Sequence, residues 1–127
     1  MKLVLQPPDS WQCGQACVAM AAGVSLKRAV ETIGHDEDTT TREVVRALRQ
    51  LGVSCESKLK RISRIKPTLP KRALVVIHRP KDEGGRKEKW HWMLAWDGQI
   101  FDPGGRWPEG YSNWRLTSCL EIHDLRN

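Results

Sequence analysis

The first half of the chain follows the hydrophobic period of helices. An apolar stripe of one helical face predicts a first helix that ends at Gly23, with Asp9 and Ser10 as cap-type residues ahead of it. The stripe comprises Cys13, Ala16, Cys17, Met20 and Val24. A second helix is predicted after Ser25, up to Gly34. A third is predicted from Thr40 to Gly52, because Glu43 stands three residues after Thr40 in a capping box.

The second half changes to the alternating or continuous apolar pattern of strands. Strands are predicted over residues 53–59, 73–78, 90–96, 99–102 and 118–123. An Asp97-Gly98 pair between two apolar runs indicates a tight hairpin. Residues 81–89 are expected to form a polar, charged connection. Helices followed by strands predict an α+β domain with a mainly antiparallel sheet: one domain over 1–127, with a helical half 1–52 and a sheet half 53–127.

Size and composition limit the classes of protein to consider. The chain has 127 residues, enough for one modest core, and its 39% hydrophobic and 28% charged residues exclude wholesale disorder. No apolar run approaches the ~20 residues that span a bilayer, and the apolar stretch ahead of Gln6 is too short for a signal peptide. We therefore expect a cytoplasmic protein with reduced cysteines. The cysteine spacings match neither a zinc ribbon nor a redox motif, so we expect no metal and no cofactor.

Positive charge is concentrated in one segment. The net charge is +6, but residues 58–89 alone hold twelve Lys or Arg against three Asp or Glu. Such a segment can engage an acidic protein surface, for example through Lys60, Arg61 and Arg64, or follow a nucleic-acid backbone. A solvated hairpin and linker is the equally open alternative. Because no RNA-binding motif is present, nucleic acid is the less favoured partner.

Cys13 is a candidate nucleophile because it opens a predicted helix. Unsatisfied N–H groups and the helix dipole at that position favour an anion, and the thiolate is the reactive form of cysteine. The same residue lies on the apolar stripe, so a buried structural cysteine is the competing interpretation. For Cys17, one turn deeper, the structural role is preferred.

The predicted hairpin brings a histidine and an aspartate together. With a two-residue turn at Asp97-Gly98, Met93 opposes Asp102, and His91 and Asp102 become diagonal neighbours on one face. A register slip of one residue would separate them. A carboxylate that orients an imidazole is the base half of a nucleophilic triad, whereas a coincidental polar pair at a strand end is the alternative.

Two segments resemble one branch of the papain-like cysteine peptidases. The segment Gln6-Pro-Pro-Asp-Ser-Trp-Gln-Cys13-Gly-Gln-Ala-Cys-Val-Ala-Met20 is similar to the nucleophile motif of the bacteriocin-processing, double-glycine leader peptidases. The stretch from His91 through Asp102-Pro103 resembles that family's His strand and Asp-Pro. The resemblance covers roughly residues 6–34 and 88–104, and it implies a papain-like fold. It also implies Cys13 as nucleophile, His91 as general base, Asp102 as orienting carboxylate and Gln6 as oxyanion-hole donor. Gln6 stands seven positions before Cys13, one more than is usual there.

Aromatic residues supply further candidates. Trp11 and Trp107 flank the candidate catalytic residues in sequence and are expected to form a substrate wall, with Gly14 and Trp92 as additional substrate contacts. Trp90, Trp92 and Trp96 alternate away from His91 and are expected mainly in the core. The leading hypothesis is a cysteine hydrolase that cleaves a peptide, isopeptide or related amide bond in a peptide or protein substrate. The alternative is a catalytically weak or inactive binding protein, an inhibitor or adaptor, that engages an acidic partner through segment 58–89.

Overall fold

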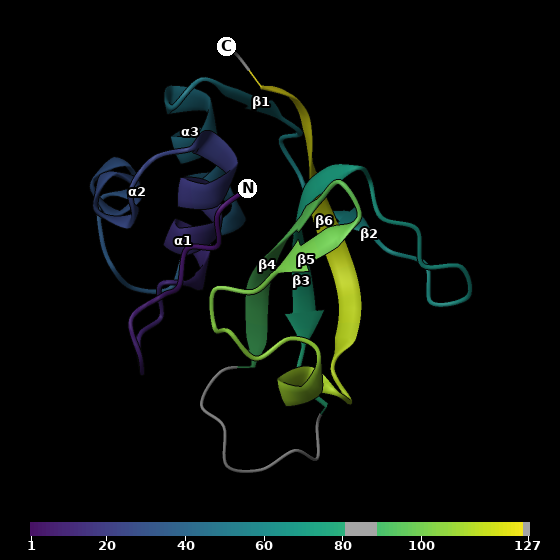
Figure 1. Ribbon diagram of the computed structural model, residues 1–127. Helices are drawn as coiled ribbons and strands as arrows, with labels where there is room; N and C mark the ends of the chain where they lie inside the picture. Colours follow the sequence, from purple (N-terminus) through teal and green to yellow (C-terminus); the bar gives the residue numbers. More distant parts are fainter. Residues whose placement is uncertain (81–88, 126–127) are drawn as a thin grey trace.

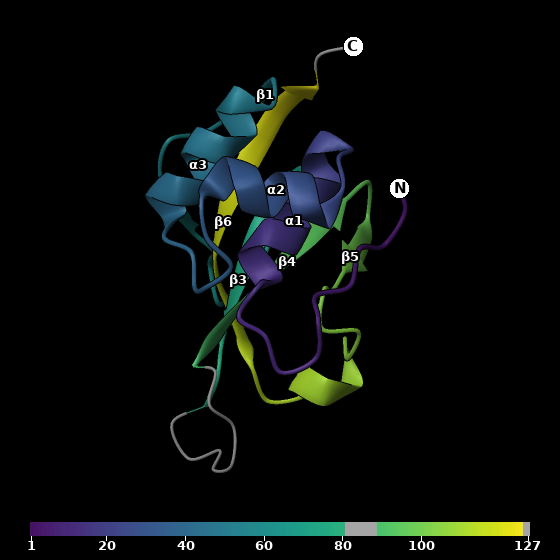
Figure 2. The same cartoon turned by 90° about the vertical axis from the view of Figure 1, so that its left-hand side faces the viewer.

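The computed structural model describes residues 1–80 and 89–125, where helices pack on one face of an antiparallel sheet (Figures 1 and 2). The helices of this part of the chain are α1 (Cys13–Ala22), α2 (Leu26–Ile33) and α3 (Thr41–Gln50). The predicted α+β class is therefore confirmed, with the helices before residue 52 and the strands after it. Of the predicted polar connection at 81–89, all but Lys89 lies outside the described residues.

The predicted starts of the second and third helices are confirmed by their caps. The Ser25 hydroxyl accepts a hydrogen bond from the N–H of Arg28. Thr40 and Glu43 form both hydrogen bonds of a capping box at the start of α3. Each cap satisfies N–H groups that have no partner inside the helix, which fixes where the helix begins.

The first helix begins differently from the prediction. Asp9 and Ser10 do not cap it: they belong to a turn in which the N–H of Ser10 donates to the carbonyl of Pro7, and Asp9 adopts a left-handed φ of 57°. The residue before the helix is Gln12, and no side chain caps α1. Two consecutive prolines redirect the chain at this point, so the cap-type residues are used in the turn instead.

Helix α1 is enclosed by the rest of the molecule. Every residue from 13 to 21 is buried, and the helix packs against α2, α3 and β4. Three alanines, Ala16, Ala19 and Ala21, are almost fully buried, and their small side chains let these neighbours approach closely. Figure 1 shows α1 between α2 and the sheet. The candidate nucleophile thus stands on a rigid central element.

The sheet places the last strand in its interior. Its described strands are β1 (Val53–Cys55), β2 (Lys60–Arg61), β3 (Arg72–His78), β4 (Trp90–Trp96), β5 (Gln99–Phe101) and β6 (Arg115–Leu125). The order is β1-β6-β3-β4-β5, and β2 also pairs with β6. A short 3₁₀ helix, η1 (Glu109–Tyr111), lies between β5 and β6. Every strand pairing among the described residues is antiparallel.

Three strand predictions need correction. Of the strand predicted over 53–59, only residues 53–55 form a strand, β1, which has a register shift against β6 between Ser54 and Cys55; β2 begins at Lys60, beyond the predicted end. The strand predicted over 118–123 runs from 115 to 125, since it pairs with β3 on one side and with β2 and β1 on the other. Strand β5 ends at Phe101, one residue before Asp102, because the Asp102 carboxylate accepts hydrogen bonds from the loop that follows.

The predicted hairpin register is confirmed. Leu94 pairs with Phe101 and Trp96 with Gln99. Asp97 and Gly98 have φ angles of 51° and 87°, the positive values that a type I′ turn requires. This tight turn determines which residues of β4 and β5 share a face.

Two apolar clusters lie on the two faces of the sheet. The cluster beneath the helices includes Leu74, Trp92 and Leu120, with residues of all three helices. The cluster on the other face includes Val75, Met93 and Tyr111. Alternation along β3 and β4 explains this division, since neighbouring residues of a strand point to opposite faces. In the described residues, no helix has the length and apolar character needed to cross a membrane.

Candidate active site

The structure brings Cys13, His91 and Asp102 together from three elements. Cys13 is the first residue of α1, His91 is the second of β4, and Asp102 follows β5 directly. His91 hydrogen bonds to Asp102, and the Cys13 side chain lies near enough to the imidazole to act on its pKa. The hairpin of β4 and β5 therefore brings His91 and Asp102 together as predicted, and the start of α1 adds Cys13 to them.

The contact between His91 and Asp102 is short and buried. Nε2 of His91 lies 2.6 Å from Oδ1 of Asp102, and the two side chains are 1% and 3% exposed. Because an ionised carboxylate can only accept, Nε2 carries the proton of this hydrogen bond. The ring nitrogen left for chemistry is therefore Nδ1.

The loop after β5 holds the Asp102 carboxylate in place. Oδ1 accepts a hydrogen bond from the N–H of Gly104, and Oδ2 accepts from the N–H groups of Arg106 and Trp107, over distances of 2.8 to 3.0 Å. A carboxylate with this many donors is fixed in orientation and favoured as the anion. The loop thus holds the Asp102 carboxylate in the position from which it bonds to His91.

The same contacts set the protonation of the pair. Burial disfavours the charged imidazole, but the hydrogen bond with Asp102 and the nearby Cys13 side chain outweigh burial and raise the pKa of His91 to about 9. Burial also opposes ionisation of Asp102, yet the hydrogen bonds from His91 and from backbone N–H groups hold the pKa of its carboxyl below the ordinary value. At neutral pH the pair is therefore an imidazolium beside a carboxylate.

Cys13 lies where the protein surface meets the core. The residue is 9% exposed, the largest exposed fraction among the four cysteines. The first turn of α1 has no acidic residue and no side-chain cap. The free N–H groups and the positive end of the helix dipole therefore act on the Cys13 sulfur or on an anion beside it.

The other cysteines have a structural character. All four cysteines are free and buried. Burial raises the pKa of the thiols of Cys17, Cys55 and Cys119, most strongly for Cys17, which is fully enclosed in the core. A raised pKa keeps a thiol protonated and unreactive, which fits a structural role for these three residues.

Tyr111 is part of the site and was not predicted from the sequence. Its ring stacks on the His91 imidazole, with centroids 5.2 Å apart and planes inclined by 19°. Trp114 packs edge-on against the Tyr111 ring, with the two ring centroids 4.9 Å apart. Arg106 donates a hydrogen bond to the Tyr111 hydroxyl. Tyr111 is the only tyrosine of the chain, but no motif marks it. Its place depends on the path of the loop from β5 to β6.

Gln6 lies beside the site through its backbone. Figure 2 shows the N-terminal segment beside the segment after β5, and the N–H of Gln6 donates to the carbonyl of Pro103 over 2.9 Å. Its side-chain Nε2 donates to the carbonyl of Ser10, also over 2.9 Å. The second hydrogen of Nε2 has the Ser10 hydroxyl 3.5 Å away, a weak contact. The described contacts of the Gln6 side-chain nitrogen are thus both with Ser10.

The tryptophans predicted to contact substrate differ in how far they are exposed. Trp11 is 37% exposed, close to Cys13 in sequence, whereas Trp107 is half-buried against the second apolar cluster. Trp92 is 1% exposed in the core beneath the helices, so its ring does not reach the surface. The expectation that Trp92 contacts substrate is therefore dropped, because the alternation of β4 turns it inward.

Gly14 serves close packing. A Cβ atom at this position would lie 2.2 Å from Oγ1 of Thr39, far inside the contact distance. The glycine thus lets the start of α1 approach the segment before α3. Gln15, fully buried, fixes the same junction by donating to the carbonyls of His35 and Glu37. These contacts hold the start of α1, and with it Cys13, against the segment before α3.

The predicted partner residues lie outside this site. Lys60 and Arg61 form β2, and Arg64 follows; all three are exposed. Across residues 1–80 and 89–125, no group of three or more His, Cys, Asp or Glu side chains is arranged to hold a metal ion.

Comparisons with protein-family models, with curated proteins and with solved structures give no match in any of the three. The assignment of function therefore rests on the geometry of the site and on the resemblance of its motifs.

Proposed function

We propose that the protein is a papain-like cysteine hydrolase that cleaves a peptide, isopeptide or related amide bond. The observation that carries this proposal is the position of His91, buried between the Asp102 carboxylate and the Cys13 thiol. A nucleophile, a base and an orienting group in hydrogen-bonding sequence are what covalent catalysis of acyl transfer requires. The chain order Cys, His, Asp and the helix-before-sheet arrangement support the papain-like assignment.

The reaction proceeds through an acyl-enzyme. The Cys13 thiolate attacks the carbonyl carbon, and a carbon–sulfur bond forms as the carbonyl electron pair moves to oxygen. The carbon–nitrogen bond then breaks, and the amine leaves with the proton that His91 donates from Nδ1. Water next gives a proton to His91 and adds to the thioester carbon. The carbon–sulfur bond breaks, which releases the acid and restores the thiolate.

The oxyanion is stabilised at the start of α1. The N–H of Cys13 and the positive end of the helix dipole face the position where negative charge develops. Gln6 contributes the second hydrogen of its Nε2, while the bond to Ser10 holds its side chain in place. Asp102 keeps the imidazole in the orientation that presents Nδ1 to the sulfur.

The test is the pH dependence of Cys13 alkylation. Folded protein is treated with limiting iodoacetamide between pH 5 and 9, and peptide mass mapping gives the rate constant at each cysteine. An isolated thiol with a pKa near 8.5 loses about tenfold in rate per pH unit below that value. A thiolate paired with the imidazolium of His91 keeps its rate nearly constant down to about pH 6.

Variants separate this pairing from simple exposure. His91→Ala is expected to restore the tenfold fall per pH unit at Cys13, whereas His123→Ala, which removes a surface histidine bonded to Glu56, leaves the profile unchanged. Cys55 and Cys119 serve as internal references in the same digest. A Cys13 profile as steep as that of an ordinary thiol in the unsubstituted protein would refute the proposal.

A further inference from the structure

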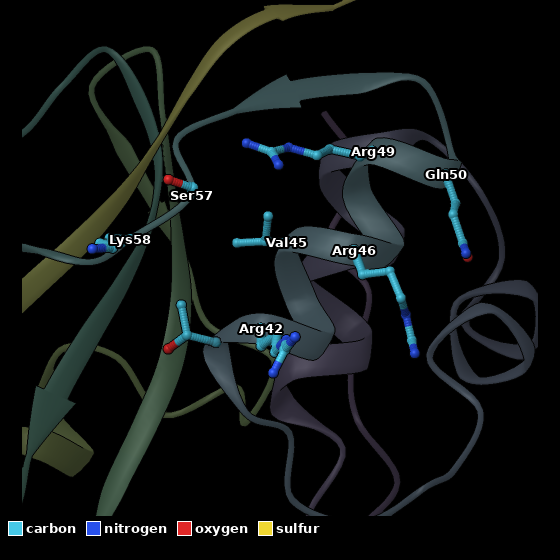
Figure 3. A pocket seen from close by; sticks show the side chains of 8 residues that line it. Arg42, Val45, Arg46, Arg49, Gln50, Ser57 and Lys58 are labelled. Carbon is cyan, nitrogen blue, oxygen red and sulfur yellow. The ribbon is translucent and has the colours of Figure 1, made fainter.

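A groove lies between α3 and the segment after β1, away from the catalytic residues. Its volume is about 830 Å³, and its walls come from α3 on one side and residues 57–58 on the other (Figure 3). This volume is in the range of sites that bind ligands rather than single ions. None of Cys13, His91 and Asp102 lines it.

The groove is strongly cationic. Its lining includes four positive side chains and no Asp or Glu: Arg42, Arg46, Arg49 and Lys58. Arg46 and Arg49 donate to the carbonyls of Ile33 and Cys55, which fixes two of the guanidinium groups. Arg42 and Lys58 are exposed and make no hydrogen bond or ion pair with any described residue. They retain their full bonding capacity for a ligand.

The floor of the groove is apolar. Figure 3 shows Val45 between Arg42 and Arg49, with its side chain directed toward Ser57 and Lys58. Val45 is 7% exposed and belongs to the cluster beneath the helices. An apolar floor between cations suits a ligand that combines carboxylates with an aliphatic side chain.

We propose that this groove binds an acidic peptide segment. Carboxylates of the peptide accept hydrogen bonds from Arg42 and Lys58, and an aliphatic side chain packs on Val45. The lining has no aromatic ring on which a base could stack, which disfavours a single-stranded nucleic acid. From Lys58 the chain continues into β2, where exposed Lys60 and Arg61 extend the positive surface. The inference does not depend on the proposed hydrolysis.

Binding is measured by fluorescence anisotropy with a labelled peptide made of Glu-Glu-Leu repeats. Cys13→Ala protein is used, so that hydrolysis and binding are separated. The peptide is expected to bind more weakly as salt rises, and the matching Gln-Gln-Leu peptide to bind at least tenfold more weakly. Arg42→Glu combined with Lys58→Glu is expected to lower affinity at least tenfold. Neither residue has a contact whose loss would unfold the chain.

Matched controls locate the site. Lys2→Glu combined with Lys27→Glu makes the same change in net charge at exposed positions outside the groove, and it is expected to lower affinity less than threefold. Val45→Thr tests the floor and is expected to weaken the Leu-containing peptide more than an all-Glu peptide. An equal loss in both double variants would show unspecific attraction and overturn the proposal. An oligothymidylate that binds tighter than the peptide and loses affinity in the groove variant would overturn it in favour of nucleic acid.

Discussion

Three residues surround the imidazole of His91: Asp102 through a hydrogen bond, Tyr111 through its stacked ring, and Cys13 through its nearby sulfur. The carboxylate and the sulfur act on charge, while the tyrosine ring fixes orientation. Because the carboxylate and the sulfur come from different elements, the protonation of His91 reports on assembly of the whole site.

The first residue-scale prediction concerns this protonation. We expect NMR titration of the His91 ring to give a pKa near 9, and Asp102→Asn and Cys13→Ala each to lower that pKa, since each removes a neighbouring group that raises it. The folded pKa lies above the unfolded value of about 6.5. The stabilisation from His91 is therefore complete below pH 6.5 and is lost as pH rises toward 9. A wild-type pKa of about 6.5 would contradict the site as described.

Gly14 provides a second prediction. Gly14→Ala places a methyl group 2.2 Å from Oγ1 of Thr39, so the segment before α3 must move away from α1. We expect a loss of about 1–3 kcal/mol in the free energy of unfolding, measured by urea denaturation. Adding Thr39→Ala removes the closest atoms, and we expect it to restore part of that loss. A Gly14→Ala protein with unchanged stability would show that the contact is not tight.

Residue-scale prediction from the sequence succeeded where a local rule applied. The pair His91 and Asp102 followed from the Asp97-Gly98 turn, because a two-residue hairpin fixes which residues share a face. Tyr111 could not be found this way. Its contact with His91 depends on the loop between β5 and β6, whose path no repeating pattern encodes.

At the scale of elements, α3 is the helix whose start is most strongly specified. Thr40→Ala removes the side chain that caps it, and we expect the protein to lose about 1 kcal/mol of stability. Thr41→Ala is the matched control, because Thr41 is the first helical residue and provides no cap. The two variants are compared by thermal denaturation. Equal effects of the two substitutions would show that the cap contributes nothing specific.

The helices were easier to predict than the strands for a physical reason. Caps such as Ser25 and Thr40 act within a few residues, so the sequence alone contains both partners of each hydrogen bond. Strand lengths depend on distant partners. The strand predicted over 53–59 ends at Cys55, and its register against β6 shifts between Ser54 and Cys55; the sequence near residue 55 carries no sign of either.

At the scale of the whole molecule, the order of the sheet was not predictable from the pattern of the chain. The alternation of apolar residues and the turns in the sequence predict an antiparallel sheet. The position of β6 between β1 and β3, however, depends on contacts between segments far apart in sequence. The same holds for the cationic groove. The basic segment was expected from residue 58 onward, whereas the arginines of α3 join it only through the packing of α3 beside β1.

The interior position of β6 has a consequence for how the molecule is made. Strand β1, which packs against α3, is joined to the β3–β4–β5 part of the sheet only through β6. On the ribosome, the helices and the β3–β5 meander can emerge and collapse separately, but their shared sheet cannot close until residues 115–125 have left the exit tunnel. A nascent chain stopped before residue 115 therefore carries two open strand edges, on β1 and β3, and exposes both to chaperones and to other chains.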